Sequence, residues 1–379
     1  MEAHAPQAFL RYFDSLSDPR RHNVRHLFTD LLAIALMAML CRADDFDEIV
    51  LWAQVRQDWL ATILELPNGI PCPDTFRRLF ARLDPLAFEE CFAGWTNALA
   101  GALDGQVIAL DGKTLRNSFE RSWDKQMVHL VSAWAAENQL VLGQIRVDEK
   151  SNEITALPKL LDLLNLKGAT VTIDAMGTQR EIAGKIIEKK GNYVLCVKEN
   201  QPQLHAKVKV LLEEAILEGF KEMSHGYHEE TSGGHGRIET RRVWVTDEIQ
   251  WLGGELLELW PGLKSVVAVE SIRRIDGGQG STQRRYFISS HGGTDAQRIG
   301  GMVRSHWGIE NKLHWQLDVT FNEDQSRMRK DFAAENVSRL RRLALNLLKH
   351  APGKGSMKNK RFRCALNSDY LLSVLAARP

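Results

Sequence analysis

The sequence predicts a mixed α/β protein in which a sheet-based core follows a helical N-terminal region and is interrupted by a β-rich insertion. The first hundred residues carry long helical patterns, short strand patterns alternate with helices after Gln106, and a second group of strand patterns precedes the last helices. These changes divide the chain into five predicted parts: a helical N-terminal domain at 1–104, a first core part at 105–200, a largely β insertion at 201–286, the final core helices at 287–350 and a basic C-terminal tail at 351–379.

The bulk composition is that of a folded globular protein. Of 379 residues, 44% are hydrophobic and 26% are charged, and Lys plus Arg exceeds Asp plus Glu by only 49 to 48. A surface that binds nucleic acid would therefore have to concentrate its basic residues in patches. The five cysteines are scattered singly, which argues against a disulfide framework or a structural zinc site and favours a reducing cytoplasm.

No segment predicts export or membrane insertion. The first ten residues lack the basic-then-apolar order of a signal peptide. The longest apolar run, from Leu31 to Cys41, is much shorter than the roughly 20 residues that a membrane span requires. We expect this run to be a buried helix of a soluble protein.

The helical patterns of the N-terminal region cover residues 27–41, 45–64 and 71–85. In the last of these, four apolar residues at helical spacing predict a face that packs into a core: Phe76, Leu79, Phe80 and Leu83. The arginines between them then point away from that core: Arg77, Arg78 and Arg82. They form either a helix that contacts DNA or an ordinary solvated face, and a second basic cluster at 19–26 favours the first reading.

From Gln106 onward the elements follow the order β-β-β-α-β-α-β, with a hairpin around Glu137-Asn138 and a right-handed crossover later. This order, followed by one further helix, is that of an RNase H-like domain. The predicted elements are strands at 106–111, 127–136, 140–148, 169–175 and 192–198 and helices at 153–166 and 177–191.

The insertion begins with a helical pattern at 203–220 and continues with a Gly- and His-rich stretch, from His228 to Glu239, that predicts a loop. Trp244 and Trp251 in this region are interpreted as core residues rather than base-stacking groups. Helical patterning resumes at Asp295. The remaining predicted elements are strands at 241–247, 265–275 and 284–290 and a final helix at 332–350.

Two acids follow apolar strand patterns, with Asp111 ending VIALD and Asp174 ending VTID. Because functional groups of open sheets gather at the carboxyl ends of parallel strands, we expect the two carboxylates to be neighbours. Two such carboxylates repel each other unless a cation lies between them. Oxygen ligands suit Mg²⁺, with Mn²⁺ as a substitute.

Glu310 is the candidate for a third ligand, because it lies in an apolar helix where an unpaired glutamate is costly. Three carboxylates can hold a pair of metal ions roughly 3.5–4 Å apart. Two alternatives remain open. Each acid alone also fits a turn or a surface ion pair, and Glu310 could form a zinc-type cluster with His306 and His314, although three ligands on one straight helical face converge poorly on one ion.

Four segments that contain these residues are long and specific: ALDGKTLR (109–116), TIDAMGTQ (172–179), VKENQPQL (197–204) and RSHWGIENKLHWQLDVTFNED (304–324). Together with the N-terminal PDTFRRLFARLDP, they resemble the insertion-sequence transposases that include the Rhs-linked H-repeat-associated proteins. The resemblance implies a DDE catalytic core with an RNase H-like fold, a helical N-terminal domain and a need for divalent metal. It places the family's triad on Asp111, Asp174 and Glu310.

One part of the wider pattern differs. Related DDE transposases that cut through a DNA hairpin carry a Tyr, Arg, Glu, Lys signature around the glutamate. Counted from Glu310, the Tyr, Arg and Lys positions hold Val303, His306 and Leu317. The triad is kept, but these residues do not support the hairpin route.

Further residues are candidates for DNA contact. Lys113 and Arg116 closely follow Asp111, and Lys198, Asn200 and Gln201 follow a strand that ends beside the predicted site; each also fits a solvated residue. His306 and His314 fit three roles, namely orienting Glu310, touching DNA or filling the core. A basic run after the helix of Glu310 completes the set: Arg327, Arg329, Lys330, Arg339, Arg341 and Arg342.

The sequence therefore predicts a DNA transposase that cleaves element ends with two Mg²⁺ ions per active site and joins the 3′-hydroxyl to target DNA. Its expected partners are double-stranded DNA, as terminal inverted repeats and as target, and a second copy of the chain when two ends are paired. The resemblance implies a bacterial cytoplasmic protein, associated with the nucleoid when bound to DNA. A metal-dependent nuclease or resolvase and a non-catalytic, domesticated DNA-binding protein remain as alternatives.

Overall fold

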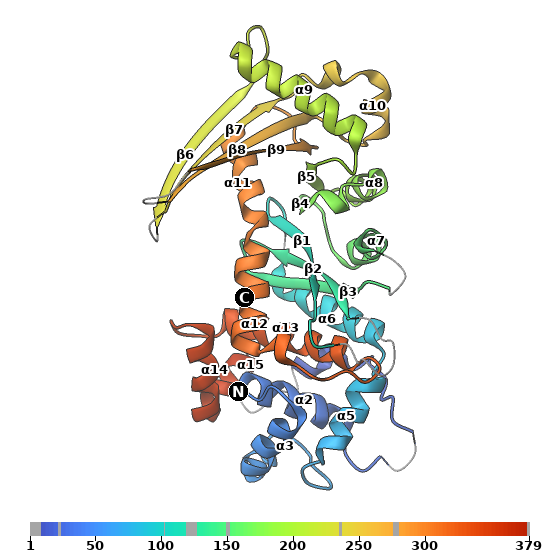
Figure 1. Ribbon diagram of the computed structural model, residues 1–379. Coiled ribbons are helices and arrows are strands. Elements are labelled where there is room, and N and C mark those ends of the chain that lie inside the picture. The colour runs from blue at the N-terminus through green and yellow to red at the C-terminus, as the bar shows by residue number, and fades with distance from the viewer. Residues whose placement is uncertain are drawn as a thin grey trace.

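The computed structural model describes residues 9–21, 24–101, 103–118, 127–148, 152–234, 237–275 and 280–376. Figure 1 shows an elongated molecule with the N-terminal helices at one end, strands β1–β3 near the middle and strands β6–β9 with helix α9 at the other end. The sheet thus extends from the centre of the molecule to the end opposite the N-terminal helices.

The N-terminal region is helical, as predicted. Prolines begin α5 and α6, where the missing N–H costs no helical hydrogen bond, and Asp45 and Asp84 cap α3 and α6. The apolar run from Leu31 to Leu40 is buried, as are the four predicted core residues in and after α5. The elements are η2 (Arg11–Phe13), α2 (Phe28–Leu40), α3 (Phe46–Val55), α4 (Gln57–Leu60), α5 (Pro73–Arg82) and α6 (Pro85–Ala100).

The core strands begin a nine-stranded sheet of order β3-β2-β1-β4-β5-β9-β8-β7-β6. β1 pairs antiparallel with β2 and parallel with β4, and β4 pairs parallel with β5. The predicted order β-β-β-α-β-α-β is confirmed, and the fold is RNase H-like. The elements are β1 (Val107–Thr114), β2 (His129–Ala135), β3 (Leu140–Arg146), α7 (Glu153–Leu163), β4 (Thr170–Ile173), η4 (Ala175–Gly177), α8 (Arg180–Glu188) and β5 (Asn192–Val197).

The strands of the predicted insertion continue this core sheet, because β9 pairs antiparallel with β5 and is followed outward by β8, β7 and β6. The loop prediction for His228 to Glu239 was wrong. The described residues of this stretch form most of β6 and the start of β7, since backbone pairing between neighbouring strands does not need apolar side chains. The elements are α9 (Pro202–Glu218), β6 (Gly226–Gly234), β7 (Arg237–Thr246), η5 (Ile249–Leu252), α10 (Gly254–Leu259), β8 (Ser265–Ile275) and β9 (Ser281–Ser289).

The two tryptophans of this region differ in burial. Trp244 is partly buried against the main core and lies under the guanidinium of Arg284, 5.5 Å from the ring centroid. Trp251 is 68% exposed, so its assignment to the core was wrong. Its neighbour Leu252 takes the buried position in the short turn η5 instead.

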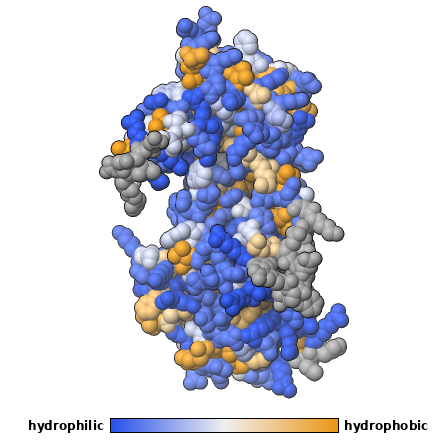
Figure 2. Space-filling model, viewed as in Figure 1, coloured by the Kyte–Doolittle hydropathy of each residue, from blue (hydrophilic) through white to orange (hydrophobic). Residues whose placement is uncertain are grey.

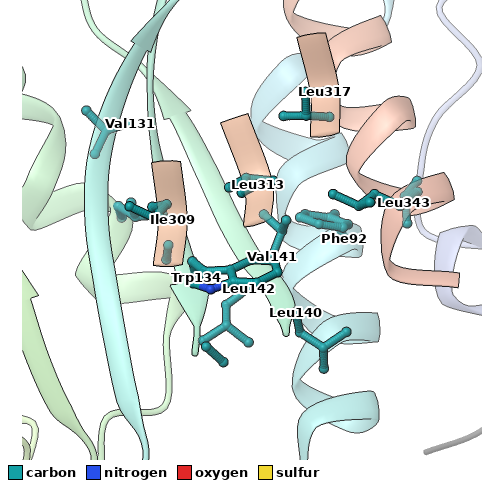
Figure 3. Packing of buried hydrophobic residues seen from close by; sticks show 14 of the residues in the cluster. Phe92, Val131, Trp134, Leu140, Val141, Leu142, Ile309, Leu313, Leu317 and Leu343 are labelled. Carbon is teal, nitrogen blue, oxygen red and sulfur yellow. The ribbon is translucent and has the colours of Figure 1, made fainter. Parts of the chain in front are cut away.

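A long helical segment then crosses the sheet as α11, a π-helical turn and α12. Figure 3 shows three residues of this segment, Ile309, Leu313 and Leu317, in one apolar cluster with Trp134 of β2 and Phe92 of α6. The elements at this end of the chain are α11 (Ala296–His306), the π-helical turn η6 (Glu310–His314), α12 (Trp315–Phe321), η7 (Glu323–Gln325), α13 (Ala333–His350), α14 (Met357–Leu366) and α15 (Ser368–Leu375).

Helix α13 corrects part of the DNA-binding prediction. Arg339 pairs with Glu89 and Glu335, Arg342 pairs with Glu323, and Arg341 is also buried. These three arginines are therefore structural, and the prediction that they bind DNA was wrong. The reason is that protein surrounds α13 on all sides, so that even its polar positions are enclosed.

Among the described residues, no helix combines the length and apolar character needed to cross a bilayer. Figure 2 shows mainly hydrophilic side chains on the visible face, with scattered apolar patches.

The basic tail predicted after residue 350 forms two helices, α14 and α15. Arg361 of α14 is buried, and it donates hydrogen bonds to the Met39 carbonyl and the Asp44 carboxylate.

Candidate active site

Asp111 and Asp174 occupy neighbouring positions on parallel strands. Leu110 of β1 is the register partner of Ile173 of β4, and each aspartate directly follows one of these residues. Asp174 follows the last residue of β4, as predicted. The prediction that Asp111 ends its strand was wrong, because β1 pairs with β2 as far as Thr114.

Glu310 reaches the same edge from the helical segment that crosses the sheet. α11 packs on β1, β4 and β5, and the fully buried Ile309 and Leu313 hold the next turns against the core. Glu310 is the first residue of the π-helical turn. Such turns are frequent at functional sites, because the wider turn changes the direction of the side chains that follow.

All three acids line one pocket of about 120 Å³. The pocket is lined by residues of β1, β4, β5 and β9 on the sheet side and by α11 and the residue after it, Trp307, on the helix side. Besides the three acids, the pocket is lined by basic and by apolar side chains. The other lining residues are Thr172, Ile173, Val194, Cys196, Lys198, Arg285, Phe287, Val303, His306 and Trp307.

Negative charge accumulates around Asp111. Burial raises the pKa of Asp111 to about 7; the Gly112 N–H opposes the shift, and the charges of Glu153, Glu310 and Asp174 add to it. Burial also acts to raise the pKa of Asp174, but the Ala175 N–H and the Lys198 ammonium outweigh it, so that this pKa is lowered. The Lys198 Nζ lies 3.3 Å from the Asp174 Oδ1.

Of the two histidines near Glu310, His306 lines the pocket, whereas His314 lies beside Asp111 and is not a lining residue. Burial lowers the pKa of His306, and it lowers the pKa of His314 to about 3. His306 Nδ1 is hydrogen-bonded to the Thr172 Oγ1 at 3.2 Å, and His314 Nδ1 lies 3.6 Å from the Asp111 Oδ2. Neither of these contacts reaches Glu310, so they do not support the predicted orienting role, and the roles of the two histidines stay predictions.

The donor set of the pocket fits a hard divalent cation, since all three acids offer oxygen ligands. As the side chains stand, no group of three or more His, Cys, Asp or Glu residues in the described part of the chain is gathered closely enough to hold a metal ion. The same holds for the zinc-type cluster of His306, Glu310 and His314. Carboxylates repel one another unless a cation lies between them, and the charges of Glu310 and Asp174 add to the rise in the pKa of Asp111 that burial causes.

Several predicted DNA contacts have structural partners instead. Lys113 is 8% exposed and donates hydrogen bonds to Asp318 (2.6 Å) and Asp324 (3.3 Å). The Asn200 side chain donates to the Ala175 carbonyl and that of Gln201 to the Thr178 carbonyl. Lys113 therefore ties β1 to the helix of Glu310, and Asn200 and Gln201 brace the turn after Asp174.

The remaining basic candidates, apart from Lys198 in the pocket wall, lie outside the pocket, and most of them are exposed. Arg77 pairs with Asp47 and Asp74, and Arg329 donates a hydrogen bond to the Asn117 carbonyl at 2.8 Å. Arg116 is 80% exposed and pairs with Asp324. The other exposed members are Arg78, Arg82, Lys198, Arg327 and Lys330.

Sequence reasoning missed Glu153, the charged neighbour of Asp111 that contributes most to its raised pKa. Glu153 Oε1 lies 2.6 Å from His129 Nε2. A Cβ on Gly112 would lie 2.1 Å from that oxygen, so the glycine makes room for the pair beside Asp111. A glycine within a strand signals such a close approach, but it does not say which side chain approaches.

Arg285 was also missed. It lines the pocket from β9, and its guanidinium lies 5.0 Å from the centroid of the Trp307 ring. The sequence analysis did not single out Arg285, because its place in the pocket depends on the pairing of β9 with β5, a long-range contact without a local sequence pattern.

The whole chain is similar to known proteins. Residues 102–347 match the family model described as "Transposase DDE domain", and residues 10–96 match the one described as "DDE_Tnp_1-associated". "Putative transposase YncI" of Escherichia coli O157:H7 is 40% identical over 375 residues, which covers 98% of this chain and 95% of that protein. "H repeat-associated putative transposase YhhI" of Escherichia coli K12 is 37% identical over 360 residues and covers 93% of both chains.

Among solved structures, the piggyBac transposase synaptic complex with hairpin DNA matches with a TM-score of 0.44 at 10% identity. The match covers 97% of this chain and 80% of that chain.

Proposed function

Because this chain belongs to the DDE transposase family, we propose that it cleaves DNA at the ends of an insertion sequence and joins the 3′-hydroxyl to target DNA. The observation that carries this proposal is the single pocket lined by Asp111, Asp174 and Glu310 at the edge of two parallel strands. Membership of the family supports DNA as the substrate, and the acidic pocket supports metal-dependent phosphoryl transfer as the chemistry.

We assign two Mg²⁺ ions, replaceable by Mn²⁺, to these carboxylates, in line with the use of divalent metal across the family. When bound, such ions activate a water or a 3′-hydroxyl and stabilise the leaving oxygen. The chain itself positions the DNA. Lys198 and Arg285 offer cations to phosphate oxygens at the mouth of the pocket, and in-line displacement depends mainly on this positioning and on charge neutralisation.

The positions that carry Tyr and Lys in hairpin-forming relatives are apolar and buried here. Val303 is 8% exposed and Leu317 is fully buried. Neither side chain can offer a polar group to a DNA end, which supports cleavage of the second strand without that signature. Denaturing electrophoresis of the cut ends should then show open strands and no covalently closed hairpins.

The test of the proposal replaces each acid by its amide: Asp111→Asn, Asp174→Asn and Glu310→Gln. With DNA that carries the inverted repeats flanking the gene, we expect wild-type protein to nick and join in Mg²⁺ or Mn²⁺. Each variant should lose at least about 10³-fold in rate, because two-metal catalysis needs all its ligands. Folding and DNA binding should be kept. Glu258→Gln, which removes an exposed carboxylate from α10, is the matched control.

The outcomes separate the rival functions. Cleavage without joining to a target plasmid would indicate a nuclease or resolvase, and binding without any metal-dependent nicking would indicate a non-catalytic DNA-binding protein. Full cleavage by one of the amide variants would remove that residue from the metal site. We also propose that two copies act together on paired ends, which light scattering of the complex with end DNA can measure.

A further inference from the structure

The segment from Asn322 to Asp331, between α12 and α13, connects the catalytic sheet with the N-terminal helices. We call it the bridging loop. Near β1, the Asp324 carboxylate pairs with Lys113 and Arg116, and its carbonyl accepts a hydrogen bond from the Asn117 side chain at 2.5 Å. Arg329 returns a hydrogen bond to the Asn117 carbonyl. The loop is therefore fixed to the strand that carries Asp111.

The other end of the bridging loop leads directly to α5. The Phe332 N–H donates a hydrogen bond to the Ala81 carbonyl at 3.2 Å. Four residues on, the side chain of Asn336 donates hydrogen bonds to the Phe80 and Leu83 carbonyls, both at 2.9 Å. These bonds satisfy the last carbonyls of α5 and hold its C-terminal end, with Arg82, beside the loop.

A groove of about 1110 Å³ runs between the bridging loop and the start of α3. The acids on its α3 side are already engaged. Asp44 is bonded to Arg361 and Asn322, Asp47 pairs with Arg77, and Asp45 caps α3. Arg327 and Lys330 on the opposite side are exposed, and neither makes an ion pair with any described residue. Asp331, next to Lys330, is an exposed acid of the same loop, so the exposed charged side chains of the loop in this groove are two cations and one acid.

Helix α5 carries further exposed basic residues. Arg78 and Arg82 are exposed and four residues apart, which places them on one face of the helix. Arg77 differs, because Asp47 and Asp74 hold it. At the other end of the loop, Arg116 pairs with Asp324, but its side chain is still 80% exposed, five residues after Asp111. Exposed basic side chains thus lie on α5, on the bridging loop and after the strand of Asp111, three segments that these hydrogen bonds and ion pairs join to one another.

We propose that this path, which we call the basic track (Arg78, Arg82, Lys330, Arg327 and Arg116), holds the phosphates of one DNA duplex and leads it from the N-terminal helices to the acidic pocket. The inference rests on the proposed function, for which it supplies the route of the DNA. Spaced cations that face solvent suit a phosphate backbone, and they position a duplex without reading its sequence. Because the bridging loop is hydrogen-bonded both to α5 and to the segment that follows the strand of Asp111, the basic track is one surface rather than two.

The test uses the double variant Arg327→Ala/Lys330→Ala and the duplex that carries the terminal inverted repeat flanking the gene. Binding is measured by fluorescence anisotropy in EDTA, so that no cleavage occurs, from about 50 to 200 mM salt. Each lost phosphate contact reduces the slope of log K against log salt by about 0.9. We expect a slope smaller by about 2 and binding at least tenfold weaker at 100 mM salt. Lys167→Ala is the control, because Lys167 is exposed in the turn before β4, at the opposite edge of the sheet.

Hydroxyl-radical footprinting then tests whether the track is continuous. The backbone positions that lose protection in the loop variant should adjoin those lost in Arg78→Ala/Arg82→Ala and lie between them and the cleaved bond. Unchanged slope in the loop variant, an equal loss in Lys167→Ala, or footprints at unconnected positions would each overturn the basic track. Wild-type protein that shows the track-dependent slope but never cuts DNA in Mg²⁺ would instead overturn the proposed function alone.

Discussion

Lys349 shows how one charged residue can oppose the stability of the fold around it. Its Nζ donates a hydrogen bond to the Gln139 Oε1 at 2.8 Å and lies 5.6 Å from the centroid of the Trp134 ring. Burial lowers the pKa of Lys349 to about 8, and the charges of Lys312 and Lys360 add to the shift. The side chain therefore has contacts but no acid among them to offset the cost of desolvating its charge.

Lys349→Met should raise the free energy of unfolding at pH 7 by about 1–2 kcal/mol, after allowance for partial solvent screening. Because the native pKa of about 8 lies below the unfolded value of 10.5, the unfolded chain binds more protons between these pH values. Wild-type stability should therefore gain a contribution from this residue as pH rises from 8 to 10.5. Urea unfolding at pH 7 and 9.5 measures both effects. Parallel pH profiles for wild type and variant would contradict them, and Lys354→Met at an exposed position is the control.

At the scale of elements, the position of Glu310 depends on how closely α11 lies on the sheet. A Cβ on Gly300 would lie 2.8 Å from the Cγ2 of Val243 in β7, whereas a Cβ on Gly301 would meet no atom within 4 Å. The α11 face with Ile299, Met302 and Val303 packs with β7, β8 and β9 in a second apolar cluster. Gly300 thus sets the distance between the helix and the sheet, and Gly301 does not.

These neighbouring glycines make a matched pair of variants. Gly300→Ala should reduce the free energy of unfolding by about 1–3 kcal/mol, because overpacking moves α11 off β7. It should also slow cleavage, since Glu310 lies in the π-helical turn that follows α11 in the same helical segment. Gly301→Ala should stabilise by about 0.5–1 kcal/mol through helix propensity and leave cleavage unchanged. Thermal unfolding and the nicking assay measure the pair, and equal effects of the two variants would refute the spacing role of Gly300.

At the scale of the whole molecule, α13 joins the N-terminal helices to the catalytic sheet. Arg339 of α13 pairs with Glu89 of α6, and the same carboxylate accepts a hydrogen bond from the Gln144 N–H of β3 at 2.7 Å. Asn346 bonds both backbone groups of Val141 in β3. Helix α13 therefore hydrogen-bonds to buried polar groups of both the N-terminal helices and the sheet. We expect the N-terminal region and the sheet to unfold together for this reason.

Arg339→Met should cost about 3 kcal/mol or more, because it leaves Glu89 buried and without its cation. The double variant Glu89→Gln/Arg339→Met should recover at least half of this loss, since Gln keeps an acceptor for the Gln144 N–H without a charge. Urea unfolding of the single and double variants gives the coupling. A double variant as unstable as the single one would show that the pair contributes through packing alone.

The order of elements and the acidic triad could be read from the sequence, because both depend on local patterns. Strand and helix periodicities gave the RNase H-like order, and the segments around Asp111, Asp174 and Glu310 placed these residues where the fold brings them into one pocket. The burial of Phe76 and its neighbours followed from helical spacing in the same way. The metal ligation of the three acids stays a prediction for the amide variants to test.

Tertiary structure alone decided which basic residues are exposed and which residues lie around the three acids. Arg327 and Arg342 stand in the same basic run, yet one is exposed on the bridging loop and the other is fully buried with Glu323. The approach of Glu153 to Asp111 and the pairing of β9 with β5 also left no local pattern. The physical reason is that periodicity reports only which side of an element a residue occupies. Whether that side meets solvent, an opposite charge or another strand depends on segments far away in the chain.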